Sequence, residues 1–155
     1  MKITDFLDEA RIIPNLKGKD KRDTLKEMAD WMSAQDQSLD AQRLIETLLK
    51  KAEEKGTTWA IGEGVAIPHV KVSGVQRLSG VFARSQEGVS FDSIDGGPSY
   101  LFFLLIEPED SAADHLKALA RISRLLKDSS FRARLMEGKT REEIFNVIKQ
   151  EDQKF

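Results

Sequence analysis

The chain has 155 residues, which suits one domain with a substantial core, and we expect residues 1–155 to form that single domain. The net charge is -2 and the charges are interspersed, which disfavours nucleic acid as a partner. With no cysteine and two histidines, disulfides, thiolate chemistry and a metal site are not expected. The N-terminus lacks a signal-peptide core and the longest apolar run is too short for a bilayer, which predicts a cytoplasmic protein without membrane insertion.

The first third of the chain is predicted to be mainly helical. Scattered apolar residues over 3–16 favour a short helix followed by an extended piece. A longer helix is expected to begin at Asp20, because apolar residues recur at helical spacing after it. A further helix is predicted over residues 40–55, with Gly56 as its C-terminal stop.

The middle of the chain is predicted to supply the strands. Residues 78–83 fit a strand buried on at least one face, and 86–89 are interpreted as a turn that leads into a short strand at 89–91. Asp95–Pro98 carries a strong turn signal. Tyr100–Ile106 is apolar throughout, which favours a central strand buried on both faces.

The last third is predicted to be helical again. Ser111 with Asp114, and Thr140 with Glu143, have the spacing of capping boxes. The helices expected here cover residues 111–127, 128–138 and 140–148, and the polar residues after them are expected to fray. Together these patterns predict an α/β layered domain with a sheet between helices.

His69 stands out because of the backbone around it. It follows a glycine-flanked turn, the apolar run Val65–Ile67 and Pro68, which ends regular strand pairing and biases Ile67 toward an extended conformation. This context predicts an imidazole held at a strand end and facing a cleft or solvent. Histidine can serve there as a nucleophile or a proton shuttle near neutral pH. The competing interpretation is an ordinary histidine at the end of a strand.

His115, the other histidine, is expected in the first turn of the helix that follows Ser111. A helix N-terminus favours a neutral imidazole and attracts anions such as phosphate. His115 could therefore donate a hydrogen bond to a phosphoryl oxygen, or hold His69 in one tautomer. The competing interpretation is a histidine at the rim of the core.

Other residues and segments give weaker functional signals than the two histidines. The Gly62–Gly64 segment lacks the features of a Walker loop or a dinucleotide fingerprint, so no nucleotide site is expected. Glu107, Glu109 and Asp110 are interpreted as solvated charges. Trp59 is interpreted as a packing residue, with an interface role as the alternative.

Several of these segments together point to a family. Gly62–His69 resembles the phosphorylation-site segment of the fructose/mannitol-type enzyme IIA domains of the bacterial phosphoenolpyruvate:sugar phosphotransferase system. Ile3–Leu7 resembles the start of that family, and Phe91–Pro98 is similar to its "F…DG.P" element. Residues 108–132 match its C-terminal helices in order, so the likeness covers nearly the whole chain. Within the family the chain is most similar to the nitrogen-regulatory enzyme IIA.

The resemblance implies a mixed β-sheet flanked by helices on both faces and a phosphocarrier activity that needs no cofactor. It implies that His69 accepts a phosphoryl group, as tele-phosphohistidine, from phosphohistidine of the carrier HPr or its nitrogen-branch paralogue. His115 would be the supporting residue. The loop residues implied to support the phosphate are Gly62, Gly64, Ile67 and Pro68.

Three functions remain open. A regulated partner such as a kinase or transporter could read the phosphorylation state, or an enzyme IIB could accept the phosphoryl group in fructose/mannitol-type uptake. The third is a degenerate binding module that is not phosphorylated, since the arginine that the family often carries before its active histidine is absent from Ala52–Lys55. Lys50, Lys51 and Lys55 are the candidates to supply positive charge, although lysine is not a bidentate substitute.

Overall fold

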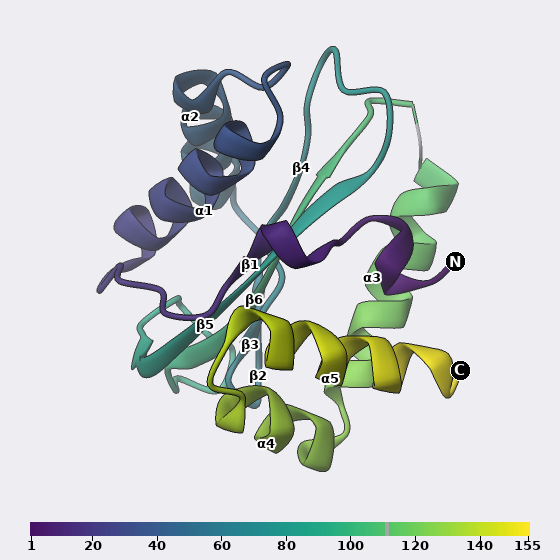
Figure 1. The fold of residues 1–155 in the computed structure, drawn as a ribbon. Helices are drawn as coiled ribbons and strands as arrows, with labels where there is room; N and C mark the ends of the chain where they lie inside the picture. Colours follow the sequence, from purple (N-terminus) through teal and green to yellow (C-terminus); the bar gives the residue numbers. More distant parts are fainter. Residues whose placement is uncertain (111) are drawn as a thin grey trace.

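The computed structural model describes residues 1–110 and 112–155 of the chain (Figure 1). In chain order the elements are the 3₁₀ turns η1 (Ile3–Asp5) and η2 (Glu9–Arg11), strand β1 (Ile12–Ile13), helices α1 (Lys21–Gln35) and α2 (Ala41–Glu53), strands β2 (Ala60–Gly62), β3 (Val65–Ala66), β4 (His69–Lys71), β5 (Ser79–Val89) and β6 (Ser99–Glu107), and helices α3 (Ala112–Leu126), α4 (Ser129–Glu137) and α5 (Arg141–Gln153). In this part of the chain, no helix combines the length and the apolar character needed to cross a membrane.

The strands form one mixed sheet, as the resemblance implied. The order is β1-β5-β6-β3-β2, and β4 pairs with β6 as well. β5 runs antiparallel to β6, and β2 antiparallel to β3, whereas the pairs β1–β5, β3–β6 and β4–β6 are parallel. β6 therefore lies at the centre, and the chain on both sides of it is held in register by the same strand.

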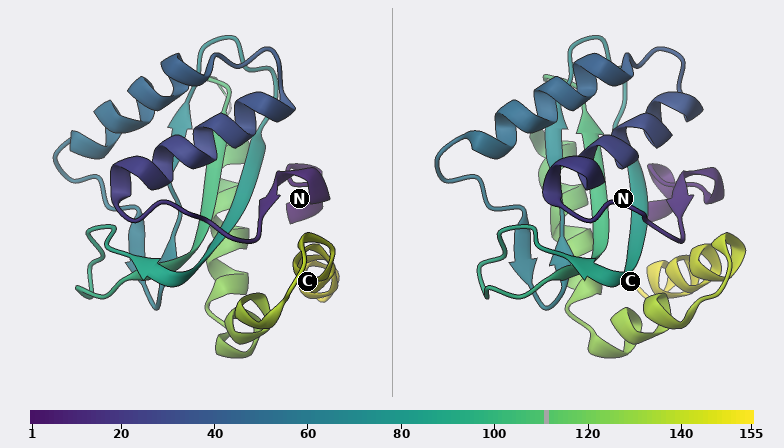
Figure 2. Two further views of the ribbon diagram at one scale, coloured as in Figure 1. Left: turned by 60° about the vertical axis from the view of Figure 1, so that its left-hand side comes forward. Right: turned by 90° about the vertical axis from the view of Figure 1, so that its left-hand side faces the viewer.

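Helices cover both faces of the sheet. α1 and α2 pack on one face, and α3, α4 and α5 lie on the other (Figures 1 and 2). Alternate residues of β6 enter the two cores: Phe102, Leu104 and Ile106 pack with the α1/α2 side, whereas Leu101, Phe103 and Leu105 pack with the α3–α5 side. The prediction of a central strand buried on both faces is confirmed.

Most helix starts follow from local capping. The side chains of Asp20, Asp40, Asp128 and Thr140 accept hydrogen bonds from backbone N–H groups in the first turns of α1, α2, α4 and α5. Such side chains satisfy donors that the helix itself leaves free. The cap expected at Ser111 lies outside the described residues. α2 ends at Glu53, earlier than the predicted stop at Gly56, because Glu54 already has an extended backbone.

The turn predicted at residues 86–89 is wrong. β5 continues through these residues to Val89, with a shift in its register against β6 between Arg84 and Val89. Gly88 takes a φ of 86°, and its N–H donates to Oγ of Ser85. A Cβ at Gly88 would lie 2.9 Å from the ring of Tyr100, so glycine lets the irregular strand pass close to its neighbour.

The fraying predicted after Ile148 is also wrong, because α5 continues to Gln153. Asp152 is 2% exposed, and its carboxylate accepts from the N–H of Thr4 at 3.1 Å and from Nε of Arg121 at 2.8 Å. Glu151 pairs with Arg134 at 2.8 Å. The hydrogen bond from Thr4 holds the last turn of α5 against the N-terminal segment, and the ion pairs hold it against α3 and α4. The two termini lie near each other in Figure 1.

Candidate functional site

The pairing of β4 with β6 brings three polar side chains to one face of the sheet. His69 lies opposite Leu105 and Lys71 opposite Glu107 in this parallel pair. Successive side chains of a strand point to opposite faces, so these four residues share a face, and Val70 takes the other one. Leu105 belongs to the core beneath α3, which identifies the shared face as the one that α3 covers.

The first turn of α3 places His115 over this face. α3 begins at Ala112, so His115 is its fourth residue. The ring centroids of His69 and His115 are 5.1 Å apart, with an interplanar angle of 48°. His69 is half-buried and the His115 side chain is 17% exposed. The structure thus brings together the two histidines that the sequence indicated.

The backbone selects one tautomer of His69. Its Nδ1 lies 2.7 Å from the carbonyl oxygen of Ile67. A carbonyl oxygen only accepts, so Nδ1 carries the proton and Nε2 keeps a free lone pair. His115 was one candidate for this orienting role, but the structure gives it to Ile67. Burial lowers the pKa of His69, although the hydrogen bond from Nδ1 opposes this shift, so the neutral form extends to lower pH than usual.

Glu107 was expected to be solvated, and this prediction is wrong. It is 2% exposed, and its Oε2 contacts Nδ1 of His115. Burial raises the pKa of Glu107 and lowers the pKa of His115. The charge of Lys71 lowers the pKa of His115 further. The strand period contained the signal, because Glu107 continues the inward-facing series Leu101, Phe103 and Leu105.

The two histidines border a cavity of about 520 Å³. Its lining comes from α2, β4, the end of β6 and the start of α3, and consists of Thr47, Lys50, Lys51, Glu54, His69, Val70, Lys71, Glu107 and His115. Lys50 and Lys51 thus border the cavity, whereas Lys55 does not. The charge of Lys51 contributes to lowering the pKa of His69, and its Nζ is 2.9 Å from the carboxylate of Glu54. The cavity combines a nucleophilic nitrogen with positive charge.

The ring of Trp59 lies beside that of His69. It is 3% exposed, and its ring centroid lies 6.3 Å from that of His69, with a tilt of 55°. Its burial confirms the packing interpretation. Contact with this ring limits the positions that the imidazole can take.

The glycines of the histidine segment lie apart from the imidazole. Gly62 and Gly64, with φ values of 94° and 76°, form the turn between β2 and β3. Val65, the residue after this turn, pairs with Leu101 and His69 pairs with Leu105, so the turn lies at least about 13 Å from His69 at roughly 3.3 Å per strand residue. Support of the phosphate by these glycines stays a prediction, whereas Ile67 and the intervening Pro68 adjoin the ring.

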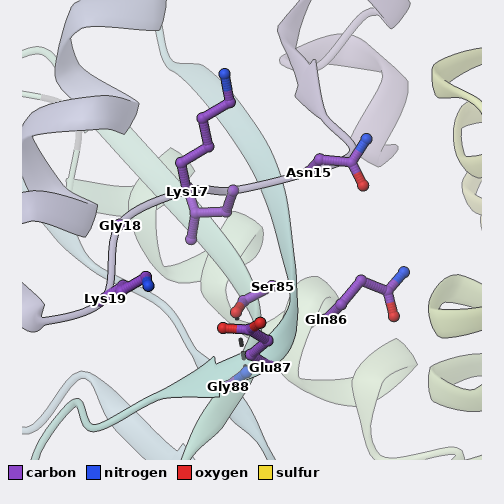
Figure 3. Close-up of a pocket in the computed structure, with 9 residues that line it drawn as sticks. Asn15, Lys17, Gly18, Lys19, Ser85, Gln86, Glu87 and Gly88 are labelled. Carbon is purple, nitrogen blue, oxygen red and sulfur yellow. Dashed lines mark hydrogen bonds between the residues drawn. The ribbon is translucent and has the colours of Figure 1, made fainter.

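A second cavity offers different chemistry. It measures about 350 Å³ and lies between residues 15–19 and the irregular part of β5, at 85–88 (Figure 3). The N–H groups of Lys17 and Gly18 donate to the carboxylate of Glu27, so they are already engaged. Neither histidine lines this cavity. Within residues 1–110 and 112–155, no group of three or more His, Asp or Glu side chains is arranged to hold a metal ion.

Comparison with known proteins agrees with this geometry. Residues 5–151 match the family model described as phosphoenolpyruvate-dependent sugar phosphotransferase system, EIIA 2. The chain belongs to this family. The EIIA chain is 40% identical over 148 residues to a nitrogen regulatory protein of Bradyrhizobium diazoefficiens, which covers 96% of this chain and 95% of that protein. It is 35% identical over 152 residues to the PTS system fructose-specific EIIABC component of Bacillus subtilis, of which it spans 24%.

The fold leads to the same family. The crystal structure of nitrogen regulatory protein IIA-Ntr from Neisseria meningitidis is similar to the EIIA chain with a TM-score of 0.85 at 31% identity, covering 94% of this chain and 98% of that one. Both comparisons confirm the resemblance found in the sequence. They assign the chain to a family of phosphoryl-transfer proteins of the phosphotransferase system.

Proposed function

We propose that Nε2 of His69 accepts a phosphoryl group from phosphohistidine of an HPr-type carrier protein, HPr itself or its nitrogen-branch paralogue. The observation that carries this proposal is the hydrogen bond from Nδ1 to the carbonyl oxygen of Ile67, which leaves Nε2 as the free nucleophile. The cavity beside it supplies lysines and a second imidazole. Membership in the EIIA 2 family supports the same chemistry.

The transfer is a direct exchange between two nitrogens. The lone pair of Nε2 attacks phosphorus as the P–N bond of the donor breaks and returns its electrons to the donor imidazole. The proton stays on Nδ1, which donates it in a hydrogen bond to the Ile67 carbonyl, so the phosphorylated ring is an imidazolium. Fixed orientation and charge stabilisation are the main sources of catalysis in phosphoryl transfer. Here the Ile67 carbonyl and the neighbouring ring of Trp59 orient His69, and the cations of the cavity supply the charge.

Phosphorylation then acts as a regulatory signal read by a partner, such as a kinase or transporter, in the cytoplasm. The relative with 40% identity and nearly equal length is a nitrogen regulatory protein, which supports this role. Transfer onward to an enzyme IIB is the second candidate. The observation that favours it is the 35% identity to one part of a fructose-specific EIIABC component.

Phosphorylation of the purified chain with phosphoenolpyruvate, enzyme I and either carrier tests the proposal. Intact mass is expected to rise by about 80 Da, the mass of one added phosphoryl group. The product is expected to be acid-labile, and long-range ¹H–¹⁵N correlation should assign the phosphorus to Nε2 of His69. His69→Ala should abolish the gain, and His115→Ala should slow it. No gain with either carrier would leave the degenerate binding module as the better description.

A further inference from the structure

Glu107 and His115 form a buried acid–imidazole pair directly beside the nucleophile. Oε2 of Glu107 contacts Nδ1 of His115, at 2% and 17% side-chain exposure. Within residues 1–110 and 112–155, neither atom has a hydrogen-bond partner apart from this mutual contact. The geometry therefore directs Nδ1 of His115 to the carboxyl and leaves Nε2 as the ring nitrogen with no assigned partner.

The buried carboxylate of Asp152, which has a structural role, has different partners from that of Glu107. Asp152, equally buried, meets Nε of Arg121 and the N–H of Thr4, a guanidinium and a backbone amide that only donate. Glu107 instead faces an imidazole, which gains and loses a proton near neutral pH. Its position at the cavity thus couples two titratable groups rather than fixing one charge.

We infer that Glu107 is a positioning residue that holds His115 through Nδ1, so that the pair takes up a proton at Nε2 of His115 when the phosphoryl group reaches His69. This inference rests on the proposed function. With one proton, shared between Oε2 and Nδ1, the pair has a charge of -1 and Nε2 is an acceptor. With a second proton, taken from solvent, the pair is neutral and Nε2–H can donate to a phosphoryl oxygen.

The phosphoryl group favours the second state on electrostatic grounds. The rings of His69 and His115 are 5.1 Å apart, so a phosphoryl dianion on His69 would repel the singly protonated pair and attract the Nε2–H donor. Burial raises the pKa of Glu107 and so favours a proton on the pair, whereas it lowers the pKa of His115, so the charge of the phosphoryl group is what drives the second proton onto Nε2. Linkage then requires that protonation of the pair strengthen phosphoryl binding by the same factor.

Other charges face the same pair. From β4 these are Lys71 and the His69 ring itself, and from α2 they are Lys50, Lys51 and Glu54 across the cavity. Among these charges, that of Lys71 lowers the pKa of His115. They set the background field, whereas Glu107 and His115 provide the change in protonation.

The first test uses the unphosphorylated protein. In ¹⁵N-histidine NMR over a pH series, the His115 ring of the wild type should show two titration steps, because it reports both its own proton and that of Glu107. Glu107→Gln should leave one step. Glu109→Gln, which removes an exposed carboxylate from the following loop, is the matched control and should keep both. A single step that is identical in wild type and Glu107→Gln would overturn the inference.

The second test measures protons and phosphoryl transfer together. In weak buffer with a pH indicator, transfer from phosphorylated HPr should draw up to one proton per phosphoryl group into the wild type at the alkaline side of its range. The wild-type rate should decline at alkaline pH, where the pair does not hold its second proton. Glu107→Gln should show neither the proton uptake nor this decline. Near neutral pH its rate should be lower than that of the wild type by roughly tenfold, as when the hydrogen-bond partners of functional histidines are removed. Glu109→Gln should behave as wild type.

The outcomes separate the two proposals. Equal proton uptake by Glu107→Gln and wild type would overturn the role of Glu107 even if transfer is efficient. A wild type that takes up no phosphoryl group would contradict the proposed function instead, and the NMR titration would still decide whether Glu107 and His115 are coupled. Thermal unfolding of Glu107→Gln at a temperature no lower than that of Glu109→Gln would show that the differences do not come from misfolding.

Discussion

Arg84 and Glu107 are both 2% exposed, yet their surroundings are opposite. Arg84, on β5, donates from Nε to the carbonyl of Pro14 and from Nη1 to the carbonyls of Leu135, Met136 and Gly138, where α4 ends. Its charge is surrounded by fixed acceptors that cannot titrate. Within residues 1–110 and 112–155, the carboxylate of Glu107 forms one ion-pair contact, with the imidazole of His115, and it borders a cavity.

The difference teaches how burial alone should be interpreted. A buried charge with a full set of partners fixes the positions of the segments that supply them, here the β1–α1 connection and the end of α4. A buried charge with one titratable partner responds to pH and to a charge that arrives next to it. The first should therefore matter for stability and the second for transfer.

Replacing Arg84 should give the largest loss of stability. Arg84→Met leaves several buried carbonyls without a donor, and each such group is costly, so we expect the free energy of unfolding to fall by about 3 kcal/mol. Urea denaturation followed by circular dichroism measures this change. Arg22→Met, which alters an exposed arginine of α1, should change stability by less than about 0.5 kcal/mol. Equal stability of the two variants would contradict a role of the buried Arg84 in holding its neighbouring segments together.

His115→Ala should have the opposite pattern to Arg84→Met, with a large effect on transfer and a smaller effect on stability. Loss of a donor aimed at the phosphoryl group should slow transfer to His69 by about 100-fold. Stability should fall by less than at Arg84, because the imidazole is partly exposed and Glu107, which loses its partner, can take up a proton. Single-turnover kinetics with phosphorylated HPr measure the rate, and Lys117→Ala, an exposed position on the same helix, is the control. A large fall in stability with normal transfer would assign His115 to the core.

Glu107→Gln should raise stability at alkaline pH, opposite in sign to the loss at Arg84. Burial raises the pKa of Glu107 in the folded protein, so the folded state holds this proton to higher pH than the unfolded state. Its contribution is complete below the unfolded pKa and is lost as pH rises through the raised one. At pH 8 the Gln variant should be more stable than wild type by about 1–2 kcal/mol.

Urea denaturation at pH 5 and pH 8 checks this prediction, and the advantage of Glu107→Gln should shrink at the lower pH. Glu109→Gln should show no such dependence, because its carboxylate is exposed. A Gln variant that is less stable than wild type at pH 8 would mean that ionised Glu107 is fully compensated, as Arg84 is.

The decrease of the transfer rate in acid, which reflects protonation of His69, should occur at lower pH than for an ordinary histidine. Burial lowers the pKa of His69, so Nε2 keeps its lone pair at pH values where an ordinary histidine is protonated. The transfer rate should therefore fall in acid only below the usual histidine range. A midpoint at or above the ordinary pKa of histidine would contradict the burial argument.

Local signals predicted the fold well. The capping residues Asp20, Asp128 and Thr140 mark helix starts because a cap acts within its own first turn. The errors came from distant partners. Residues after Ile148 remain helical because Thr4 and Arg121 meet Asp152, contacts that no local pattern contains.

The candidate site was partly readable in the same sense. The family motif indicated His69 and His115, and Pro68 indicated a fixed backbone beside the ring. The tautomer could not be inferred, because it depends on where the Ile67 carbonyl points. Glu107 was missed because its polarity suggested solvent, whereas its burial depends on α3 covering the end of β6.

The smallest predicted effect concerns Lys51, the best candidate to replace the positive charge of the missing arginine. Lys51 borders the cavity and its charge acts on His69, but Glu54 pairs with it and its side chain is 45% exposed. Lys51→Ala should therefore slow transfer only about threefold, and less at high salt, since exposed charges are screened. Lys55→Ala is the matched control, because Lys55 does not border the cavity.

Single-turnover rates at low and high salt measure both variants. If Lys55→Ala slowed transfer as much as Lys51→Ala, with the same salt dependence, the lysines would act by long-range attraction of the carrier rather than at the phosphoryl group. A larger effect of Lys51→Ala that persists at saturating carrier would instead assign its amine to the transferring group. The charge at the cavity would then complement the proton that Glu107 and His115 supply.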